Sequence, residues 1–322
     1  MNDRYQRVLI KNKYSKNCFS EWEKVKQGIP QGSILGQFFF LLYINDLPGI
    51  INDMFKPTIF ADDTSMIFTH SNLTDFKGGI NIVFEKISKW FQTNSLILNF
   101  SKAHYMQFMA KSKPAVVVHI GYKDNPINII CSTNFLGLTL DSTLSWKTHT
   151  DQLSFKLNSA CCIIRSLKSL ISTKNLRTVS YGHSIMAYGI IFQGNSPYIN
   201  NIFKLQKRAI KIIMNVDNRV SCRELLKKLN ILPLHSQYIL SLLLFVVKNI
   251  KEFISNSILN SINTHHRSDL YAPSVKLTKY QKGVYYSGIK IFNHLPQIIK
   301  NLSWNVKKFK LAPKVSKTYL VM

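Results

Sequence analysis

The spacing of hydrophobic positions along the chain changes near Trp146. Before this residue, short β-branched and aromatic runs alternate with Gly, Pro, Asn and Asp, which predicts strands; after it, apolar residues recur at helical spacing. The predicted strands are residues 57–60, 65–68, 105–108, 115–120 and 135–140. The predicted helices are residues 35–43, 80–93, 153–170, 176–187, 202–214 and 238–248, and the region from Asn263 onward is predicted to be rich in loops. The pattern indicates an α+β first part followed by a mainly helical part.

Length and composition allow one large hydrophobic core or two modest ones, since the chain has 322 residues and 46% hydrophobic content. No apolar run reaches the roughly 20 residues of a membrane-spanning helix, and the N-terminus has no secretory signal, so we expect an intracellular protein without a membrane segment. The five cysteines have neither zinc-site nor disulfide spacing and are predicted to be small buried thiols.

Positive charge is concentrated in the second part of the chain. Residues 1–146 carry a net charge of +4, whereas residues 147–322 hold 27 basic and 5 acidic residues, a net charge of +22. A surface of this sign favours a polyanion, and nucleic acid is the common one. The alternative is a basic surface that only keeps the chain soluble.

Two adjacent carboxylates, Asp62 and Asp63, lie between two short apolar runs in the sequence Phe-Ala-Asp-Asp-Thr at residues 60–64. The flanking runs are predicted to pair as a β-hairpin with the carboxylates at its apex. Hard oxygen ligands in such a position suit Mg²⁺, and two such ions clamp a phosphoryl displacement. The alternative is ordinary turn chemistry, because Asp is common in turns.

A glycine-rich stretch at residues 27–36 comes immediately before an apolar helix. Its glycines allow close approach of the backbone, and the free N–H groups that open the helix can meet a phosphate or a base edge. A tight loop that leads into the helix and binds no ligand is equally consistent with this pattern.

Residues 27–48 together with residues 60–64 resemble the palm of reverse transcriptases from jockey-like retrotransposons, which lack long terminal repeats. Further stretches that resemble later palm, primer-grip and thumb motifs of this family follow in order at residues 90–108, 135–149, 188–190, 205–209, 221–223 and 292–296. The resemblance therefore covers essentially the whole chain.

The resemblance implies a partial polymerase palm at residues 1–145, a helical thumb at residues 146–230 and a basic helical C-terminal extension at residues 231–322. It implies an RNA-directed DNA polymerase that uses Mg²⁺ at a two-metal site. The implied partners are an RNA template, a DNA primer or target, and deoxynucleoside triphosphates. The implied location is the nucleus, at the site of target-primed synthesis.

The resemblance also assigns roles to individual residues. Asp62 is the metal-binding carboxylate with Asp63 as its supporting neighbour, and Lys102 lies near the departing pyrophosphate, unless it is only a solvated lysine after a turn. The pocket for the incoming nucleotide and the template is implied to be lined by Gln31, Gly32 and Ser33. The primer end is implied to be positioned by Phe135, Leu136 and Gly137, which are otherwise strand core.

The chain also departs from the family pattern. A further aspartate that supplies the other shared metal ligand precedes, in the family, the stretch resembling residues 3–8, so one carboxylate side of the two-metal site is expected to be missing here. Gln37, Ala103 and Gln193 replace the usual Pro, Thr and Trp. We therefore expect no primer extension by the chain alone. The alternatives are a nucleic-acid-binding remnant without catalysis and the product of a pseudogene.

Overall fold

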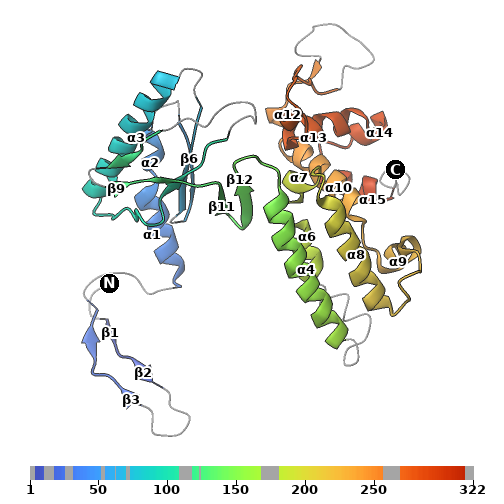
Figure 1. Ribbon diagram of the computed structural model, residues 1–322, viewed down its shortest axis with the longest axis horizontal. Coiled ribbons are helices and arrows are strands. Elements are labelled where there is room, and N and C mark those ends of the chain that lie inside the picture. The colour runs from blue at the N-terminus through green and yellow to red at the C-terminus, as the bar shows by residue number, and fades with distance from the viewer. Residues whose placement is uncertain are drawn as a thin grey trace. The chain divides into compact units, whose positions relative to one another are not determined.

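The computed structural model describes residues 4–10, 18–25, 32–51, 55–61, 63–69, 73–108, 118–122, 125–167, 181–256 and 269–315 (Figure 1). The chain divides into two compact units. The first unit comprises Met1–Tyr105 and Pro114–Ile130, and the second comprises Met106–Lys113 and Cys131–Met322.

The first unit is organised around an antiparallel hairpin of β5 (Phe55–Phe60) and β6 (Asp63–Phe68), which confirms the strands predicted at residues 57–60 and 65–68. Helix α3 (Leu73–Thr93) supplies the core on one face of this hairpin. The rings of Phe55 and Phe68 stack at a centroid distance of 4.2 Å and pack with buried Val83 and Ile87 of α3. The predicted helix at residues 80–93 is therefore correct but begins earlier, at Leu73.

Helices α1 (Ile34–Ile44) and α2 (Leu47–Ile50) precede the hairpin, and α1 confirms the helix predicted at residues 35–43. Both helices meet the end of α3 in a small cluster that includes Ile44, Leu47 and Trp90. The indole N–H of Trp90 also donates to the Asp46 carboxylate at 3.3 Å. Most of the remaining apolar side chains of α1 are exposed.

The other strands of the first unit are short pairs. They are β1 (Tyr5–Gln6) with β4 (Glu23–Lys24), β2 (Leu9–Ile10) with β3 (Cys18–Phe19), β7 (His104–Tyr105) with β10 (Asn128–Ile129), and β8 (Gly121–Tyr122) with β9 (Asn125–Pro126). The β7–β10 pair is parallel, and the others are antiparallel.

Two predicted strands, at residues 105–108 and 115–120, are largely wrong. Of the strand predicted at residues 105–108 only Tyr105 is in a strand, and residues 118–120 form none, while residues 115–117 lie outside the described residues. The physical reason is packing: buried Val118 and Ile120 join Phe84 of α3 in a core cluster, and the Tyr105 hydroxyl donates to the Val118 carbonyl at 2.6 Å. Apolar residues that fill a core in an irregular segment give the same sequence signal as a strand.

The second unit contains an antiparallel hairpin of β11 (Ser132–Phe135) and β12 (Leu138–Asp141). The single strand predicted at residues 135–140 is therefore wrong, because the chain reverses at Leu136 and Gly137. These residues have φ angles of 47° and 79°, in the left-handed region. The turn was not predicted, because the apolar residues of this stretch gave the signal of one continuous strand.

Helices make up most of the second unit. They are α4 (Lys147–Leu167), α6 (Tyr181–Ala187), α7 (Ile190–Gln193), α8 (Ile199–Met214), α9 (Cys222–Leu229) and α10 (Leu234–Lys248), followed by the 3₁₀ turn η1 (Ile250–Glu252). The helices predicted in this region are confirmed, except that residues 168–170 and 176–180 lie outside the described residues. Helix α10 lies in the middle of the core, with Leu242 and Val246 fully buried.

The region after Asp269 is helical rather than rich in loops, which corrects the prediction for residues from 263 onward as far as they are described. Its helices are α12 (Thr278–Gln281), α13 (Val284–Asn293), α14 (Gln297–Lys300) and α15 (Val306–Val315). Pro296 had suggested a loop, but it occupies the N-cap of α14, where a proline does not break a helix. Fully buried Ile289 and Phe309 join the core beside α10.

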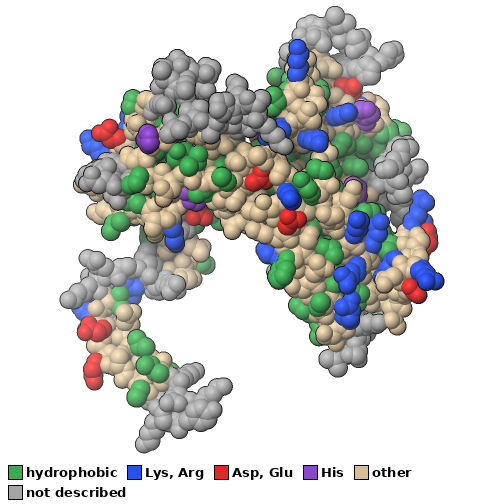
Figure 2. All heavy atoms as spheres, viewed as in Figure 1, with side chains coloured by type: hydrophobic (Ala, Val, Ile, Leu, Met, Phe, Trp, Pro, Cys, Tyr) green, Lys and Arg blue, Asp and Glu red, His purple; other side chains and the backbone are tan. Residues whose placement is uncertain are grey.

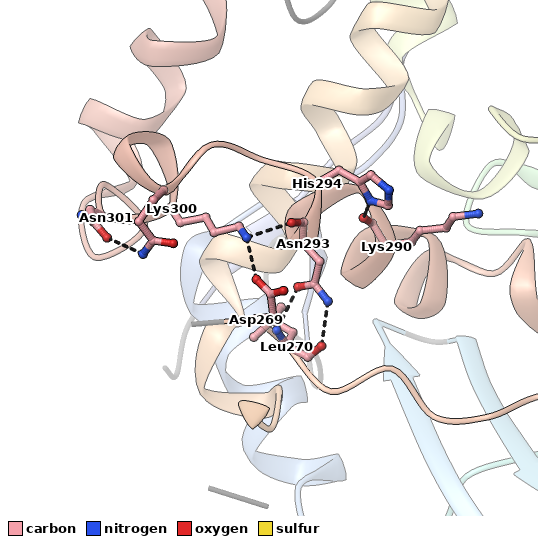
Figure 3. Close-up of polar contacts among 8 residues, drawn as sticks. Asp269, Leu270, Lys290, Asn293, His294, Lys300 and Asn301 are labelled. Atoms are coloured by element: carbon pink, nitrogen blue, oxygen red, sulfur yellow. Dashed lines mark hydrogen bonds and ion pairs between the residues drawn. The ribbon is translucent and has the colours of Figure 1, made fainter. Parts of the chain in front are cut away.

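A buried ion pair connects the segment at Asp269 to this helical region (Figure 3). The Lys300 ammonium lies 2.6 Å from Asp269 Oδ1 and also donates to the Asn293 carbonyl at 2.8 Å. The Asn293 amide in turn accepts from the Leu270 N–H at 2.9 Å and donates to the Leu270 carbonyl at 2.8 Å. The contacts join α13 and α14 to an irregular strand-like segment.

The cysteines are all free thiols, but the prediction that they are buried holds only for Cys161 and Cys222. Cys18, Cys131 and Cys162 are exposed. Within the described ranges, no single helix is long and apolar enough to cross a membrane, although the pair α9 and α10, bent by 48°, meets the criteria of length and composition together.

Candidate functional site

The predicted carboxylate apex lies at the tip of the β5–β6 hairpin. Phe60 is paired with Asp63, so two residues, Ala61 and Asp62, connect the strands. Ala61 has a φ of 51°, a left-handed conformation that a tight hairpin turn demands and that costs a non-glycine residue about 1–2 kcal/mol. The prediction of a hairpin apex is confirmed, while Asp62 itself lies outside the described residues.

Alternation along the hairpin separates its apolar face from the face that carries Asp63. Along β6, the side chains of Thr64, Met66 and Phe68 point to one face, and Phe68 packs against α3. Asp63 therefore points to the opposite face, which it shares with exposed Phe60 and Ile67. The strand packing thus presents one carboxylate to solvent beside the turn.

Asp63 has the properties of a ligand for a hard cation. It is exposed, and among the described residues no cationic side chain forms an ion pair with it. A carboxylate in this state can contribute oxygen to Mg²⁺, which keeps most of its water ligands and takes one or two carboxylates. Within the described ranges, no group of three or more His, Cys, Asp or Glu side chains could hold a metal ion, so the metal site stays a prediction.

The glycine-rich stretch reaches the described structure at Gly32 and Ser33, and Gln31 lies outside it. Ser33 is the N-cap of α1, because its hydroxyl accepts from the Gly36 N–H at 3.2 Å. Gly32 has a φ of 82° and open space where a side chain would begin. The observed role of Ser33 is thus to cap α1, and the nucleotide pocket at residues 31–33 stays a prediction.

Helix α1 and the hairpin share a core. That residues 31–33 lie close to the apex, which one nucleotide contacting both would require, stays a prediction. Phe40 of α1 and Ile59 of β5 pack against the same cluster of buried residues. Ile59 is adjacent to the last residue of β5, near the turn. Ser33 lies about 10 Å along the helix axis from Phe40, at 1.5 Å per residue.

Lys102 lies in an exposed turn that Asn99 organises. The Lys102 N–H donates to the Asn99 carbonyl at 3.1 Å, and the Ser101 hydroxyl donates to the Asn99 side-chain oxygen at 2.6 Å. The Lys102 ammonium has no carboxylate partner within the described part of the chain. Sequence reasoning matched Asn99 to a motif but gave it no role; the structure shows that it shapes the turn presenting Lys102.

In the second unit, Leu136 and Gly137 form the reversal between β11 and β12, and Phe135 is the last residue of β11. The Tyr188 hydroxyl donates to the Leu136 carbonyl. On the other strand, the Thr139 N–H donates to Nδ1 of buried His149 at 3.3 Å. Sequence reasoning assigned no role to Tyr188 or His149, and only their places in family-like motifs pointed to them.

Two titratable groups beside this hairpin have altered proton affinities. Burial, reinforced by the charge of Lys156, lowers the pKa of His149. Partial burial opposes ionisation of Asp141, but hydrogen bonds from Thr143, Ser145 and Trp146 outweigh it and hold the pKa of this carboxyl below its ordinary value. Asp141 thereby stabilises the turn that leads from β12 into α4.

A basic surface lies on α8, and we define it by Lys204, Lys207, Arg208 and Lys211. These four residues recur at helical spacing on one face, whereas Ile202, Gln206, Ile210 and Ile213 are buried on the other. Figure 2 shows Lys and Arg side chains gathered over α8 and α9. Among the described residues, no carboxylate forms an ion pair with the α8 basic surface.

Local contacts orient these cations without neutralising them. The Lys207 ammonium lies 4.2 Å from the centroid of the Phe203 ring, and the Lys211 ammonium donates to the Asn218 carbonyl. Arg208 Nη1 is within 3.5 Å of Asn158 Oδ1 on α4. An uncompensated row of this kind suits the phosphates of a nucleic-acid backbone.

Comparison with known proteins gives two distant similarities. The chain is 24% identical over 209 residues to a probable RNA-directed DNA polymerase from transposon X-element of Drosophila melanogaster, which covers 64% of this chain and 22% of that protein. It is 26% identical over 251 residues to a probable RNA-directed DNA polymerase from transposon BS of the same organism, covering 74% of this chain and 27% of that protein.

The chain thus spans about a quarter of the length of these curated relatives. No protein-family model matches it, and no solved structure matches it. The two similarities support a reverse-transcriptase-like chain of retrotransposon type.

Proposed function

We propose that this chain is a portion of an RNA-directed DNA polymerase from a jockey-like retrotransposon without long terminal repeats. The observation that supports the proposal is the β5–β6 hairpin, in which exposed Asp63 is the first residue of β6, directly after the turn. The two transposon polymerase similarities support the same assignment.

In this proposal Asp62 and Asp63 hold Mg²⁺, with the second carboxylate side supplied from outside residues 1–322. The metal, when bound, supplies positive charge to the phosphates of the reacting nucleotide. Lys102 would stabilise negative charge on the departing pyrophosphate from its exposed turn. The stretch Gln31–Gly32–Ser33 would line the pocket for nucleotide and template, through backbone groups because the Ser33 hydroxyl already caps α1.

The second unit would bind the primer–template duplex. Its α8 basic surface faces phosphates, and the turn at Phe135, Leu136 and Gly137 addresses the primer end. Phosphate contacts fix the register of a duplex without reading its sequence, so binding is expected to show little sequence preference.

Primer extension on an RNA template with Mg²⁺ tests the catalytic part of the proposal. The assay compares this chain with a version extended at its N-terminus by the preceding in-frame coding sequence, and we expect extension only by the longer version. Asp62→Ala in that version should lower the rate on the order of a thousandfold, because several kcal/mol of charge stabilisation are lost.

Asp151→Ala is the matched control, since Asp151 is an exposed carboxylate on α4. Full activity of the Asp62→Ala version would remove the metal-binding role of the hairpin.

Nucleic-acid binding without catalysis is the second candidate function. The α8 basic surface favours it, because its four cations lie on one helix face and, among the described residues, no carboxylate forms an ion pair with them. Duplex binding by the chain together with no extension by the longer version would establish this alternative.

A further inference from the structure

The turn between β11 and β12 adopts a conformation that its own sequence does not favour. Leu136 has a φ of 47°, which is uncommon for a residue with a branched apolar side chain, and Gly137 follows with a φ of 79°. Such a conformation persists only where the surrounding structure holds it. The contacts around the turn therefore show which residues determine its position.

Tyr188 contacts the turn directly. Its hydroxyl donates to the Leu136 carbonyl, and its ring lies against Gly137, where an added Cβ would be 3.3 Å from Tyr188 Cε1. The Tyr188 side chain is 55% exposed, so it contributes little to the hydrophobic core. Its main described contact is with the turn.

Gly189 brings the backbone beside Tyr188 close to β12. It has a φ of 65°, and an added Cβ would lie 2.4 Å from Leu138 Cδ2, closer than real Cβ contacts permit. The next residue, Ile190, is 2% exposed in the helical core. A larger residue at position 189 would have to adopt this left-handed φ and would require the Leu138 side chain to move.

The opposite flank of the hairpin is fixed to α4. The Thr139 N–H donates to His149 Nδ1 at 3.3 Å, and the Thr139 hydroxyl donates to the Gln152 side-chain oxygen at 2.6 Å. The hairpin is therefore held to the helical unit from two sides, with Tyr188 and Gly189 nearest the reversal.

We infer that Tyr188 and Gly189 are positioning residues for the Leu136–Gly137 turn, and that they set where this turn meets the 3′ end of a bound primer. The inference rests on the proposed function for the role of the turn. The turn and the α8 basic surface belong to the same compact unit. In the proposed function, one unit would therefore bind the duplex and position the primer end.

Two measurements on the full chain test this inference, with Tyr188→Phe as the variant because it removes the hydroxyl and keeps the ring. In the absence of nucleic acid, hydrogen exchange of peptides covering residues 135–139 should accelerate about fivefold, the factor expected for one lost hydrogen bond. With a primer–template duplex that carries 2-aminopurine at the primer 3′ end, the fluorescence change on binding should fall at least about threefold while the Kd stays within about twofold.

Tyr280→Phe is the matched control, because Tyr280 is exposed and its hydroxyl makes no hydrogen bond within the described part of the chain. It should leave both measurements unchanged. Gly189→Ala should reproduce the Tyr188→Phe result, and Gly189→Ala with Leu138→Ala should partly reverse it by removing the contact with Leu138.

Unchanged exchange in Tyr188→Phe would overturn the inference. So would faster exchange with an unchanged primer-end signal, since the turn would then be held by Tyr188 without addressing the primer. Failure of the unaltered chain to bind the duplex is a different result: it would remove the proposed duplex-binding function, and the primer role with it, while the exchange measurement still reports on the contact.

Discussion

At the scale of single residues, His149 shows how the fold selects one protonation state. Its Nδ1 accepts a hydrogen bond from the Thr139 N–H, which requires that nitrogen to be unprotonated. Burial and the nearby Lys156 charge also disfavour the imidazolium and lower the pKa of His149. The neutral ring therefore connects α4 to the β11–β12 hairpin.

This arrangement predicts a pH dependence of stability. Because the pKa of His149 is lower in the folded state, the unfolded state takes up the proton first as the pH falls below about 6.5. The free energy of unfolding of the second unit should thus be highest above that pH and decrease below it, by about 1.4 kcal/mol for each tenfold difference in proton affinity.

Urea unfolding between pH 5 and pH 8 measures this effect. His149→Gln should flatten the pH dependence, and His294→Gln, which changes an exposed histidine of the same unit, should not. An unchanged slope in His149→Gln would show that another group is responsible.

Some residues of the candidate site could be predicted and others could not. Two acidic residues between apolar runs indicated the hairpin apex, because turn residues between β-forming segments are a local signal. Leu136 gave no such signal, since a leucine in the left-handed region is held there by Tyr188, which lies far away in the sequence. A local sequence pattern cannot reveal a contact between residues so far apart in the sequence.

At the scale of elements, long amphipathic helices such as α8 were predictable because their own periodicity specifies the buried face. The short helices α12 and α14 were not, because four residues give no periodicity and their position depends on the core beside α10. The small parallel pair β7–β10 was also missed, because its two strands are distant in sequence.

The Asp269–Lys300 pair gives a prediction at this scale. Asp269→Ala should lower the free energy of unfolding of the second unit by about 3 kcal/mol, because it leaves the Lys300 ammonium buried without its charge partner. Replacing both residues, Asp269→Leu with Lys300→Met, should cost clearly less, since no buried charge remains.

Chemical denaturation of the three proteins measures the difference. Glu224→Ala is the control, because the Glu224–Lys227 pair is exposed to solvent and its loss should hardly move the midpoint. Equal destabilisation by the single and the double change would show that packing rather than charge pairing explains the effect.

At the scale of the whole molecule, the separation of charge agrees with the separation into units. The proposed carboxylate apex lies in the first unit, whereas residues 147–322, with a net charge of +22, lie in the second. Charge asymmetry is visible in the sequence. The sequence does not show which face carries the positive charge, because the packing of α8 against α4 and α9 decides which cations remain on the surface.

The salt dependence of the affinity shows whether the second unit binds a duplex through phosphates. Titration of a labelled RNA–DNA duplex with the full chain at several salt concentrations should give a log–log slope of about −0.9 for each phosphate neutralised. The triple change Lys204→Gln, Lys207→Gln and Lys211→Gln should make that slope shallower by about 2 to 3.

The triple change Lys276→Gln, Lys279→Gln and Lys282→Gln removes the same charge from exposed positions outside the α8 basic surface and should alter the slope much less. We expect a steep slope that becomes shallower with the α8 change in particular. A flat salt response, or an equal loss of slope with both triple changes, would contradict phosphate binding by the α8 basic surface.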